Sequence, residues 1–77
     1  MPTLKILDGY RFFFYSNDHD PPHIHIEKDN KTAKFNLVPV ELVKSQKFNA
    51  SELKKIRIMV EDNVEFFKKE WNEFFND

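Results

Sequence analysis

The sequence has no cysteine, a single glycine and no long apolar run. Without cysteine the chain forms neither disulfides nor thiolate metal sites, and it has no thiol nucleophile. One glycine is too few for the glycine-rich phosphate loops of the Walker and Rossmann types. A membrane-spanning helix needs roughly 20 consecutive apolar residues, and the sequence contains no such run. Thiol enzymes, enzymes with glycine-rich nucleotide loops and helical membrane proteins are therefore excluded.

Length and charge limit the chain further. Its 77 residues suffice for one small domain, residues 1–77. The formal net charge is −1, so composition alone does not favour nucleic acid, and any such binding must be local. The first residues do not show the basic segment and apolar segment of a secretory signal. We therefore expect a soluble, cytoplasmic protein that does not contact a membrane.

A first β-hairpin is predicted near the start of the chain. The dipeptide Asp8-Gly9 separates two β-prone segments. Asp-Gly suits a two-residue type I′ turn because both of its positions need a positive φ. We expect strands at 3–7 and 10–15. Aromatic side chains occupy both faces of the second strand, which is therefore either covered on both sides or presents aromatics to a partner.

A second hairpin is predicted around Asp29-Asn30, directly after the stretch HIHIEK. Its strands are expected at 23–28 and 31–37. With a two-residue turn, every apolar residue meets an apolar one and every polar residue a polar one. The predicted pairs are His23 with Asn36, Ile24 with Phe35, His25 with Lys34, Ile26 with Ala33, Glu27 with Thr32 and Lys28 with Lys31. A slip by one residue would lose this match, so the register is well defined.

The register separates two faces, because side chains alternate along a strand. The core face carries Ile24, Ile26, Ala33, Phe35 and Leu37. The opposite face carries His23, His25, Glu27, Thr32, Lys34 and Asn36. One face is apolar, as packing against a helix requires, and the other holds titratable groups. The segment VPVELVKSQ can then add a short edge strand, and the sheet is expected over about 3–43.

A helix is predicted over about 50–76, where apolar residues recur at three- and four-residue steps without an intervening Gly or Pro. Asn49 is the expected N-cap, and Glu52 completes a capping box. We therefore expect an α+β fold, in which an antiparallel sheet of three to five strands, built from β-hairpins, packs against one long C-terminal α-helix.

The predicted helix is longer than the sheet. A helix of roughly 26 residues measures about 39 Å, whereas a six-residue strand spans about 20 Å. Either the helix kinks and folds back, or its last turns bury aromatic side chains against another chain. Those side chains are Phe66, Phe67, Trp71, Phe74 and Phe75.

The polar face suggests a metal site as one hypothesis. His23 and His25 project to the same side of a strand, so both imidazoles could ligate one ion. The preceding loop offers a third ligand from among Asp18, His19 and Asp20. Zinc and nickel suit such a set, with His19, His23 and His25 as the ligands expected first. Lys34, directly opposite His25, disfavours a cation, so we expect no cofactor, or weak zinc or nickel binding.

The same lysine favours a second hypothesis. His23, His25 and Lys34 would form a donor patch for a phosphate, and paired imidazoles can act as base and acid on a phosphodiester without a metal. A base would stack beside the patch on aromatic side chains of the first hairpin, either Phe12 and Phe14 or Phe13 and Tyr15. This arrangement is typical of a ribonuclease-like enzyme, in which these three polar residues would be catalytic.

A third hypothesis assigns no chemistry to the polar face. Exposed polar alternation is what a sheet with one solvated face requires. The protein would then bind another protein, a second copy of itself or nucleic acid through its sheet face or its helix. The side chains expected to contact a partner are Asp18, His19, Asp20, Glu27, Trp71 and Phe74.

Three stretches carry a resemblance to a known family. They are MPT at the start, FFFYSNDHDPPHIHIEKDNKTAKF in the middle, and the helix from FNASELKKI to WNEFF. Together they resemble the small bacterial domain-of-unknown-function 4160 family over essentially the whole chain. The resemblance implies a stand-alone cytoplasmic domain, in some cases encoded in pairs reminiscent of toxin–antitoxin modules, and it names no catalytic residue. The positions that match the motif are His19, Pro21, Pro22, His23, His25 and Glu27.

Taken together, the residues and the resemblance predict a small cytoplasmic interaction module, one member of a toxin–antitoxin-like pair, that binds protein or nucleic acid. A metal-independent, histidine-dependent ribonuclease is the alternative, and a metal-binding protein is the third possibility.

Overall fold

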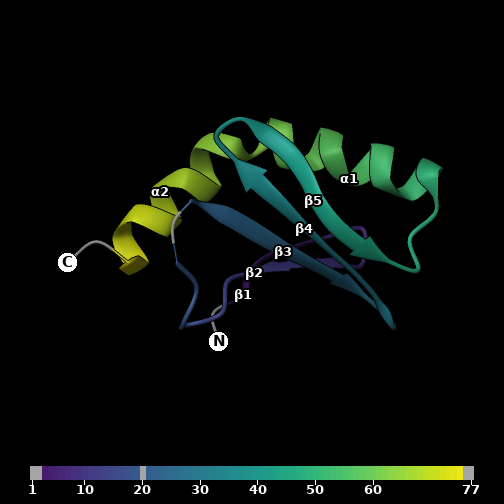
Figure 1. Cartoon of the computed structure of the whole chain (residues 1–77), viewed down its shortest axis with the longest axis horizontal. Helices are drawn as coiled ribbons and strands as arrows, with labels where there is room; N and C mark the ends of the chain where they lie inside the picture. Colours follow the sequence, from purple (N-terminus) through teal and green to yellow (C-terminus); the bar gives the residue numbers. More distant parts are fainter. Residues whose placement is uncertain (1–2, 20, 76–77) are drawn as a thin grey trace.

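The structure is a computed structural model that describes residues 3–19 and 21–75. Its strands are β1 (Thr3–Leu7), β2 (Tyr10–Phe13), β3 (His23–Lys28), β4 (Lys31–Leu37) and β5 (Val40–Gln46), and its helices are α1 (Ala50–Asp62) and α2 (Val64–Phe75). Each strand pairs antiparallel with the next, in the order β1-β2-β3-β4-β5, so that β1 and β5 form the edges of the sheet (Figure 1). The expected α+β fold with an antiparallel sheet is confirmed.

The sheet differs from the expected one at two strand ends. β2 ends at Phe13 and not at residue 15, and β5 continues to Gln46, beyond the expected limit of 43. The β4–β5 ladder contains an irregularity next to Lys34. Because this irregularity interrupts the alternation of apolar and polar residues, the sequence pattern of β5 resembled only a short edge strand.

Both predicted hairpins form. Asp8 and Gly9 have φ angles of 51° and 82°, which is the left-handed backbone that a type I′ turn needs. Between β3 and β4, all six predicted residue pairs are present. This register gives Ile24, Ile26 and Phe35 to the face that the helices cover, where they are fully or almost fully buried.

The helix begins as predicted. The side chain of Asn49 accepts a hydrogen bond from the backbone N–H of Glu52 at 2.8 Å, and the Glu52 carboxylate accepts one from the N–H of Asn49 at 3.1 Å. These two bonds form the capping box. Within the described residues, neither helix is long and apolar enough to cross a membrane.

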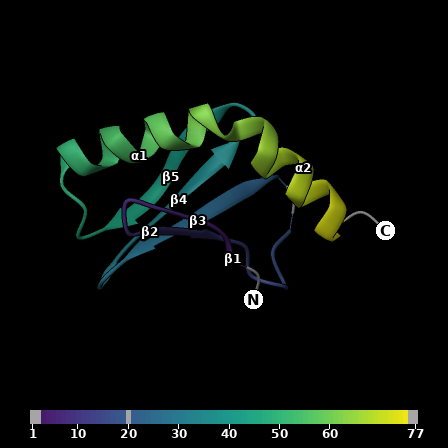
Figure 2. The ribbon, with the colours of Figure 1, turned by 180° about the vertical axis from the view of Figure 1, so that it is seen from behind.

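The prediction of one long helix is wrong, because Asn63 divides the segment into α1 and α2. The Asn63 side chain donates to the carbonyl of Met59 at 2.8 Å and accepts from Lys5 Nζ on β1 at 2.8 Å. Asparagine competes in this way with the regular helical hydrogen bonds. The kink resolves the mismatch in length: α1 lies across the sheet, and α2 bends down past its end (Figures 1 and 2).

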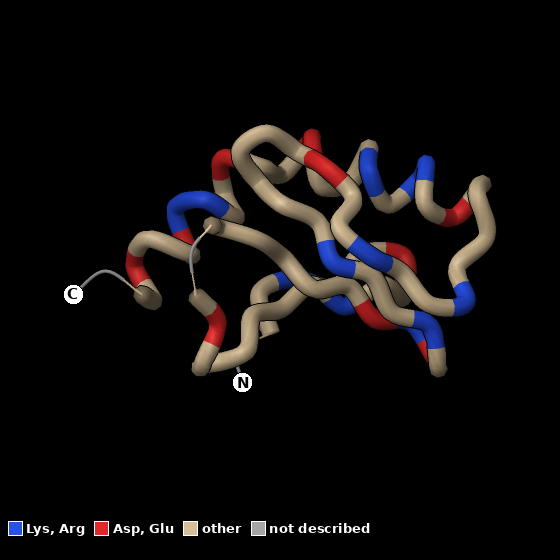
Figure 3. Tube along the Cα trace, viewed as in Figure 1, with Lys and Arg blue, Asp and Glu red and all other residues tan. Residues whose placement is uncertain are grey.

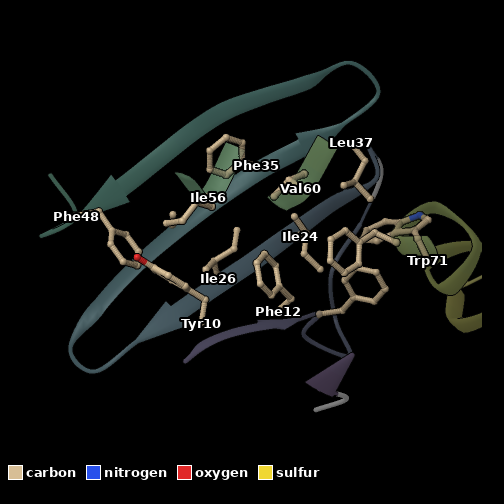
Figure 4. Close-up of a cluster of buried hydrophobic side chains, with 13 residues drawn as sticks. Tyr10, Phe12, Ile24, Ile26, Phe35, Leu37, Phe48, Ile56, Val60 and Trp71 are labelled. Carbon is tan, nitrogen blue, oxygen red and sulfur yellow. The ribbon is translucent and has the colours of Figure 1, made fainter. Parts of the chain in front are cut away.

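The core lies between the sheet and the two helices (Figure 4). Phe12 from β2 stacks on Phe67 from α2, with ring centroids 5.4 Å apart. Phe14 packs edge-on against Trp71 at 5.1 Å. The two central aromatics of the first hairpin that face the helices are therefore interior residues and cannot stack a ligand.

Within the described residues, both helices lie on one face of the sheet (Figure 2). The other face, called here the open face, carries Arg11, Phe13, His25, Lys34 and Lys44. Phe13 is nevertheless buried, because the Arg11 guanidinium lies 4.1 Å from its ring centroid and His25 stacks on it at 5.5 Å. Phe12 and Phe13 on the two faces of this strand are therefore both buried, whereas Tyr15, beyond the end of β2, is exposed.

Candidate functional site

Three ligand-type side chains meet at the end of the open face where β3 begins. They are Asp18 from the loop before β3, and His23 and His25 from β3 itself, called here the Asp–His–His cluster. One ligand atom from each residue lies within 4.8 Å of the other two. The strand alternation brings the two histidines together, as predicted.

The loop before β3 is folded so that Asp18 faces the strand. The Asp18 carboxylate accepts a hydrogen bond from the N–H of Tyr15 at 2.9 Å, and the N–H of Asp18 donates to the carbonyl of Tyr15 at 3.1 Å. The carbonyl of Pro22 accepts from the N–H of Leu37 on β4 at 3.0 Å. The loop is thus tied at both ends, which fixes the position of the carboxylate.

His23 is buried, which corrects the expectation that it lies on a solvated face. Its side chain is packed between the loop and α2, with Trp71 at 5.0 Å between ring centroids. Nδ1 donates to the carbonyl of Pro21 at 2.9 Å. Nε2 is buried and has no hydrogen-bond partner among the described residues, although Asp18 Oδ1 lies 3.2 Å away.

His25 is half-buried and held between two aromatic rings. Phe13 stacks on one side, and Tyr15 packs edge-on at 4.7 Å between centroids. Its Nε2 donates a hydrogen bond to the Asp18 carboxylate, at 3.2 Å from Oδ2 and 3.4 Å from Oδ1. Burial lowers the pKa of His25 and outweighs the opposing effect of Asp18, and the positive charge of Lys34 adds a small decrease. The lowered pKa favours the neutral ring, which a metal ligand must be, and Nε2 binds a metal only when the ring hydrogen lies on Nδ1.

Asp18 remains ionised although it is partly buried. Burial raises the pKa of its carboxyl group, but the hydrogen bond from Tyr15, the contact with His23 and the charges of both imidazoles together lower the pKa below the ordinary value. The cluster thus combines one carboxylate with two imidazoles.

Two hollows flank the cluster on the open face. The larger has a volume of about 470 Å³ and includes Asp18, His19, His23 and Lys34 in its lining. The smaller has a volume of about 200 Å³, uses His25 as one wall and extends over β4 and β5. The cluster is therefore accessible from outside although His23 is buried.

The other predicted site residues have different surroundings, and none of those that the structure describes belongs to the cluster. His19 is exposed, lines the larger hollow and is not part of the cluster. Asp20 lies outside the described residues. Glu27 accepts hydrogen bonds from Arg11 at 2.9 and 3.2 Å and so forms an ion pair that links β3 to β2. Lys34 lies beside His25, as predicted.

The two aromatic residues expected to contact a partner have different environments. Trp71 is 3% exposed and packs against Phe14 and His23, so its indole is part of the interior. Phe74 is 43% exposed and remains on the surface of α2.

Sequence reasoning missed Lys44, which pairs directly with Lys34. A two-residue turn at 38–39 aligns β4 with β5 and indicates that Lys44 lies near Lys34. The irregularity next to Lys34 shifts the register at this point, so the exact pair could not be predicted from the turn. Tyr15 was considered only as one of four aromatics, and its hydrogen bond to Asp18 was not expected.

Comparison with known proteins adds a family but no assigned activity. No curated protein and no solved structure matches the chain significantly. The sequence of residues 9–72, which include the Asp–His–His cluster and both lysines of the β4–β5 pair, matches the family described as Domain of unknown function (DUF4160). The chain belongs to this family.

Proposed function

We propose that the protein binds one divalent transition-metal ion through Asp18, His23 and His25, and that this ion is its functional centre. The observation that carries the proposal is Nε2 of His23, a buried nitrogen without a hydrogen-bond partner that faces a carboxylate and a second imidazole. Of the three hypotheses from the sequence, the geometry favours the metal site, with Asp18 in the place first expected for His19.

The tautomer of His23 follows from its neighbours. The carbonyl of Pro21 can only accept, so Nδ1 carries the hydrogen. In the neutral ring Nε2 then has a lone pair, which lies close to the Asp18 carboxylate without forming a hydrogen bond. Two acceptors held together in a buried place repel each other and raise the free energy of the folded state. A cation bound by both atoms removes this repulsion.

The spacing of the donor atoms fits one ion. Zinc lies about 2.0–2.2 Å from nitrogen and oxygen ligands, so two ligands of a tetrahedral site are about 3.4 Å apart. In the cluster, Asp18 Oδ1 lies 3.2 Å from Nε2 of His23 and 3.4 Å from Nε2 of His25, and one ligand atom from each residue lies within 4.8 Å of the other two. The protein therefore holds these atoms close to the separations that a metal requires.

The donor set indicates the type of metal and of chemistry. Imidazole and carboxylate ligands suit zinc, nickel and iron(II). Three protein ligands leave one coordination position open, as in catalytic zinc sites, where a bound water becomes more acidic. Lys34 acts in two directions, because its charge opposes a nearby cation but also lowers the pKa of His25 and so favours the unprotonated ring. The centre is thus of the kind that activates water.

Partner binding and a toxin–antitoxin-like role stay predictions. The helix side chains left exposed for such contact are Ile58, Phe66 and Phe74.

The proposal is tested by titrating zinc and nickel into protein that has been stripped with a chelator. We expect one ion per chain and a rise in the unfolding temperature, because an ion that binds only the folded state stabilises it. Affinity should fall from pH 7 to pH 5, since protons compete for the imidazoles. Asp18→Ala and His25→Ala should weaken binding by more than about 100-fold, because even outer-shell changes cost 10–100-fold.

His19→Ala is the matched control, since His19 lies in the same loop but outside the cluster. It should bind the metal like the unmodified protein. The proposal fails if His25→Ala binds as tightly as the unmodified protein, or if only His19→Ala loses the ion.

A further inference from the structure

We propose that the smaller hollow beside the cluster binds the phosphate of a nucleotide, whose base stacks on Tyr15. This hollow, called here the phosphate pocket, has Tyr15, His25, Thr32, Lys34, Lys44 and Gln46 in its lining. The inference deepens the proposed function, because His25 belongs both to the phosphate pocket and to the metal site. It rests on the proposed function only for the claim that the phosphate lies next to the metal.

The first argument is an uncompensated pair of lysines. Lys34 and Lys44 stand directly opposite each other on β4 and β5. Figure 3 shows basic segments on this part of the sheet. Like charges in this arrangement destabilise a sheet. Among the described residues, no carboxylate lies within ion-pair distance of either lysine, whereas Lys31 at the end of β4 has Glu52 at 2.9 Å. A bound anion would offset the repulsion between Lys34 and Lys44.

The second argument is the character of the pocket wall. Besides apolar Phe13, Ile26 and Ala33, the residues that line it include two lysines and the polar side chains of Thr32, Ser45 and Gln46, but no carboxylate. Ammonium, hydroxyl and amide groups are the donors that proteins use for phosphate. The formal charge of −1 for the whole chain therefore conceals a local site that favours anions.

The third argument concerns size and stacking. A volume of about 200 Å³ is below the roughly 300–1,000 Å³ of pockets that enclose a drug-sized ligand. The pocket can thus hold a phosphate, while an attached ring stays outside it. Tyr15 is 44% exposed at the rim, and Phe13 is buried beneath. Tyrosine rings of this kind stack bases in proteins that bind single-stranded nucleic acid.

Tyr15 also has a fixed position. Its backbone N–H is bound by Asp18, and its ring meets those of Phe13 and His25 edge-on, at interplanar angles of 88° and 68°. Little side-chain freedom is lost when a base stacks on a ring that is already held. The same loop therefore supplies a metal ligand and a stacking platform.

The test measures binding of adenosine 5′-monophosphate, adenosine, inorganic phosphate and a five-nucleotide single-stranded RNA by calorimetry, with a chelator present. The monophosphate should bind more tightly than either adenosine or phosphate. Lys34→Gln and Lys44→Gln should each weaken it about 10-fold, because each removes a charged donor. Tyr15→Ala should reduce the affinity for the monophosphate to that for phosphate.

Lys54→Gln on α1 is the matched control, because it changes the net charge equally but lies outside the pocket. It should bind the monophosphate like the unmodified protein. The lysine variants of the pocket should fold, since each relieves a like-charge contact.

The outcomes separate the possible sources of the nucleotide and the two proposals. Binding of RNA more than about 10-fold tighter than the monophosphate identifies a strand as the ligand, and equal affinities identify a free nucleotide. Absence of nucleotide binding, or binding that Lys34→Gln and Lys44→Gln leave unchanged, overturns the inference even if zinc binds. Nucleotide binding in a protein that takes up no metal would overturn the proposed metal function alone.

Discussion

On the helix side of β3, Ile24 and Ile26 have no exposed surface, and on the opposite side His23 is only 4% exposed. The helix side is buried by apolar side chains of α1 and α2, which any sequence with this hydrophobic pattern would supply. The open face is buried only locally, by the loop around Asp18 and by Trp71. Burial on one side follows from the fold, and burial on the other serves a polar cluster.

The difference indicates where folding and function compete. Buried histidine and aspartate side chains cost free energy unless their polar atoms are paired, and Nε2 of His23 is not paired. Local arrangements that oppose stability are expected at functional sites. The contrast between the faces therefore supports a ligand for the cluster more strongly than the presence of histidine does.

The largest expected effect lies on the helix side. Ile24→Ala should lower the free energy of unfolding by about 2–5 kcal/mol, because it leaves a cavity among closely packed residues. His25→Ala, one position along the strand on the half-buried open face, should cost under roughly 1 kcal/mol without metal. Urea denaturation of both variants in chelator measures the difference. Equal losses would show that the open face contributes to folding as much as the core does.

His23→Ala should have an intermediate effect, about 1–3 kcal/mol, because the side chain is buried against Trp71 but removing it also removes an unpaired nitrogen. This cost is larger than the one expected for a residue on a solvated face, where the sequence placed His23. Saturating zinc should widen the gap to the unmodified protein, since the variant lacks one ligand. Denaturation with and without zinc tests this. A gap that zinc does not change would remove His23 from the proposed site.

The fold was predictable where local patterns decide it. The β3–β4 register follows from matching polar and apolar residues, and the helix start follows from Asn49 and Glu52. The break at Asn63 was not predictable in the same way, because the apolar stripe continues through it. It depends on a hydrogen bond from Lys5, at the other end of the chain. Contacts between distant residues leave no local pattern to read.

The site was predictable to a similar degree. The alternation of His23 and His25 showed that both imidazoles project from one side of a strand. It could not show which residue of the loop joins them, because this choice depends on the hydrogen bond between Tyr15 and Asp18. Nor could it show that Trp71 covers His23, since this contact requires the bend before α2.

The smallest expected effect concerns the ion pair between Lys31 and Glu52. This pair lies outside the Asp–His–His cluster and therefore serves as a control for the predictions about the cluster. Lys31 on β4 donates to Glu52 on α1 at 2.9 Å and so ties the helix to the sheet. This hydrogen bond, followed by the one from the N–H of Asn49, lowers the pKa of Glu52 below its ordinary 4.5. The pKa of Lys31 is raised above 10.5, mainly by the same bond.

Glu52→Gln should therefore destabilise the protein slightly at pH 7, and the deficit should shrink as the pH falls below 4.5. The unfolded chain takes up a proton near pH 4.5 that the folded chain does not, so the contribution of Glu52 is complete above this pH and is lost as the pH falls through the lower folded value. Urea denaturation between pH 7 and pH 3, with Lys31→Gln and the double variant to isolate the pair, measures the effect. Zinc should change none of these differences, because neither residue belongs to the Asp–His–His cluster. A deficit that persists unchanged at pH 3 would show that Glu52 stabilises the protein through uncharged capping contacts alone.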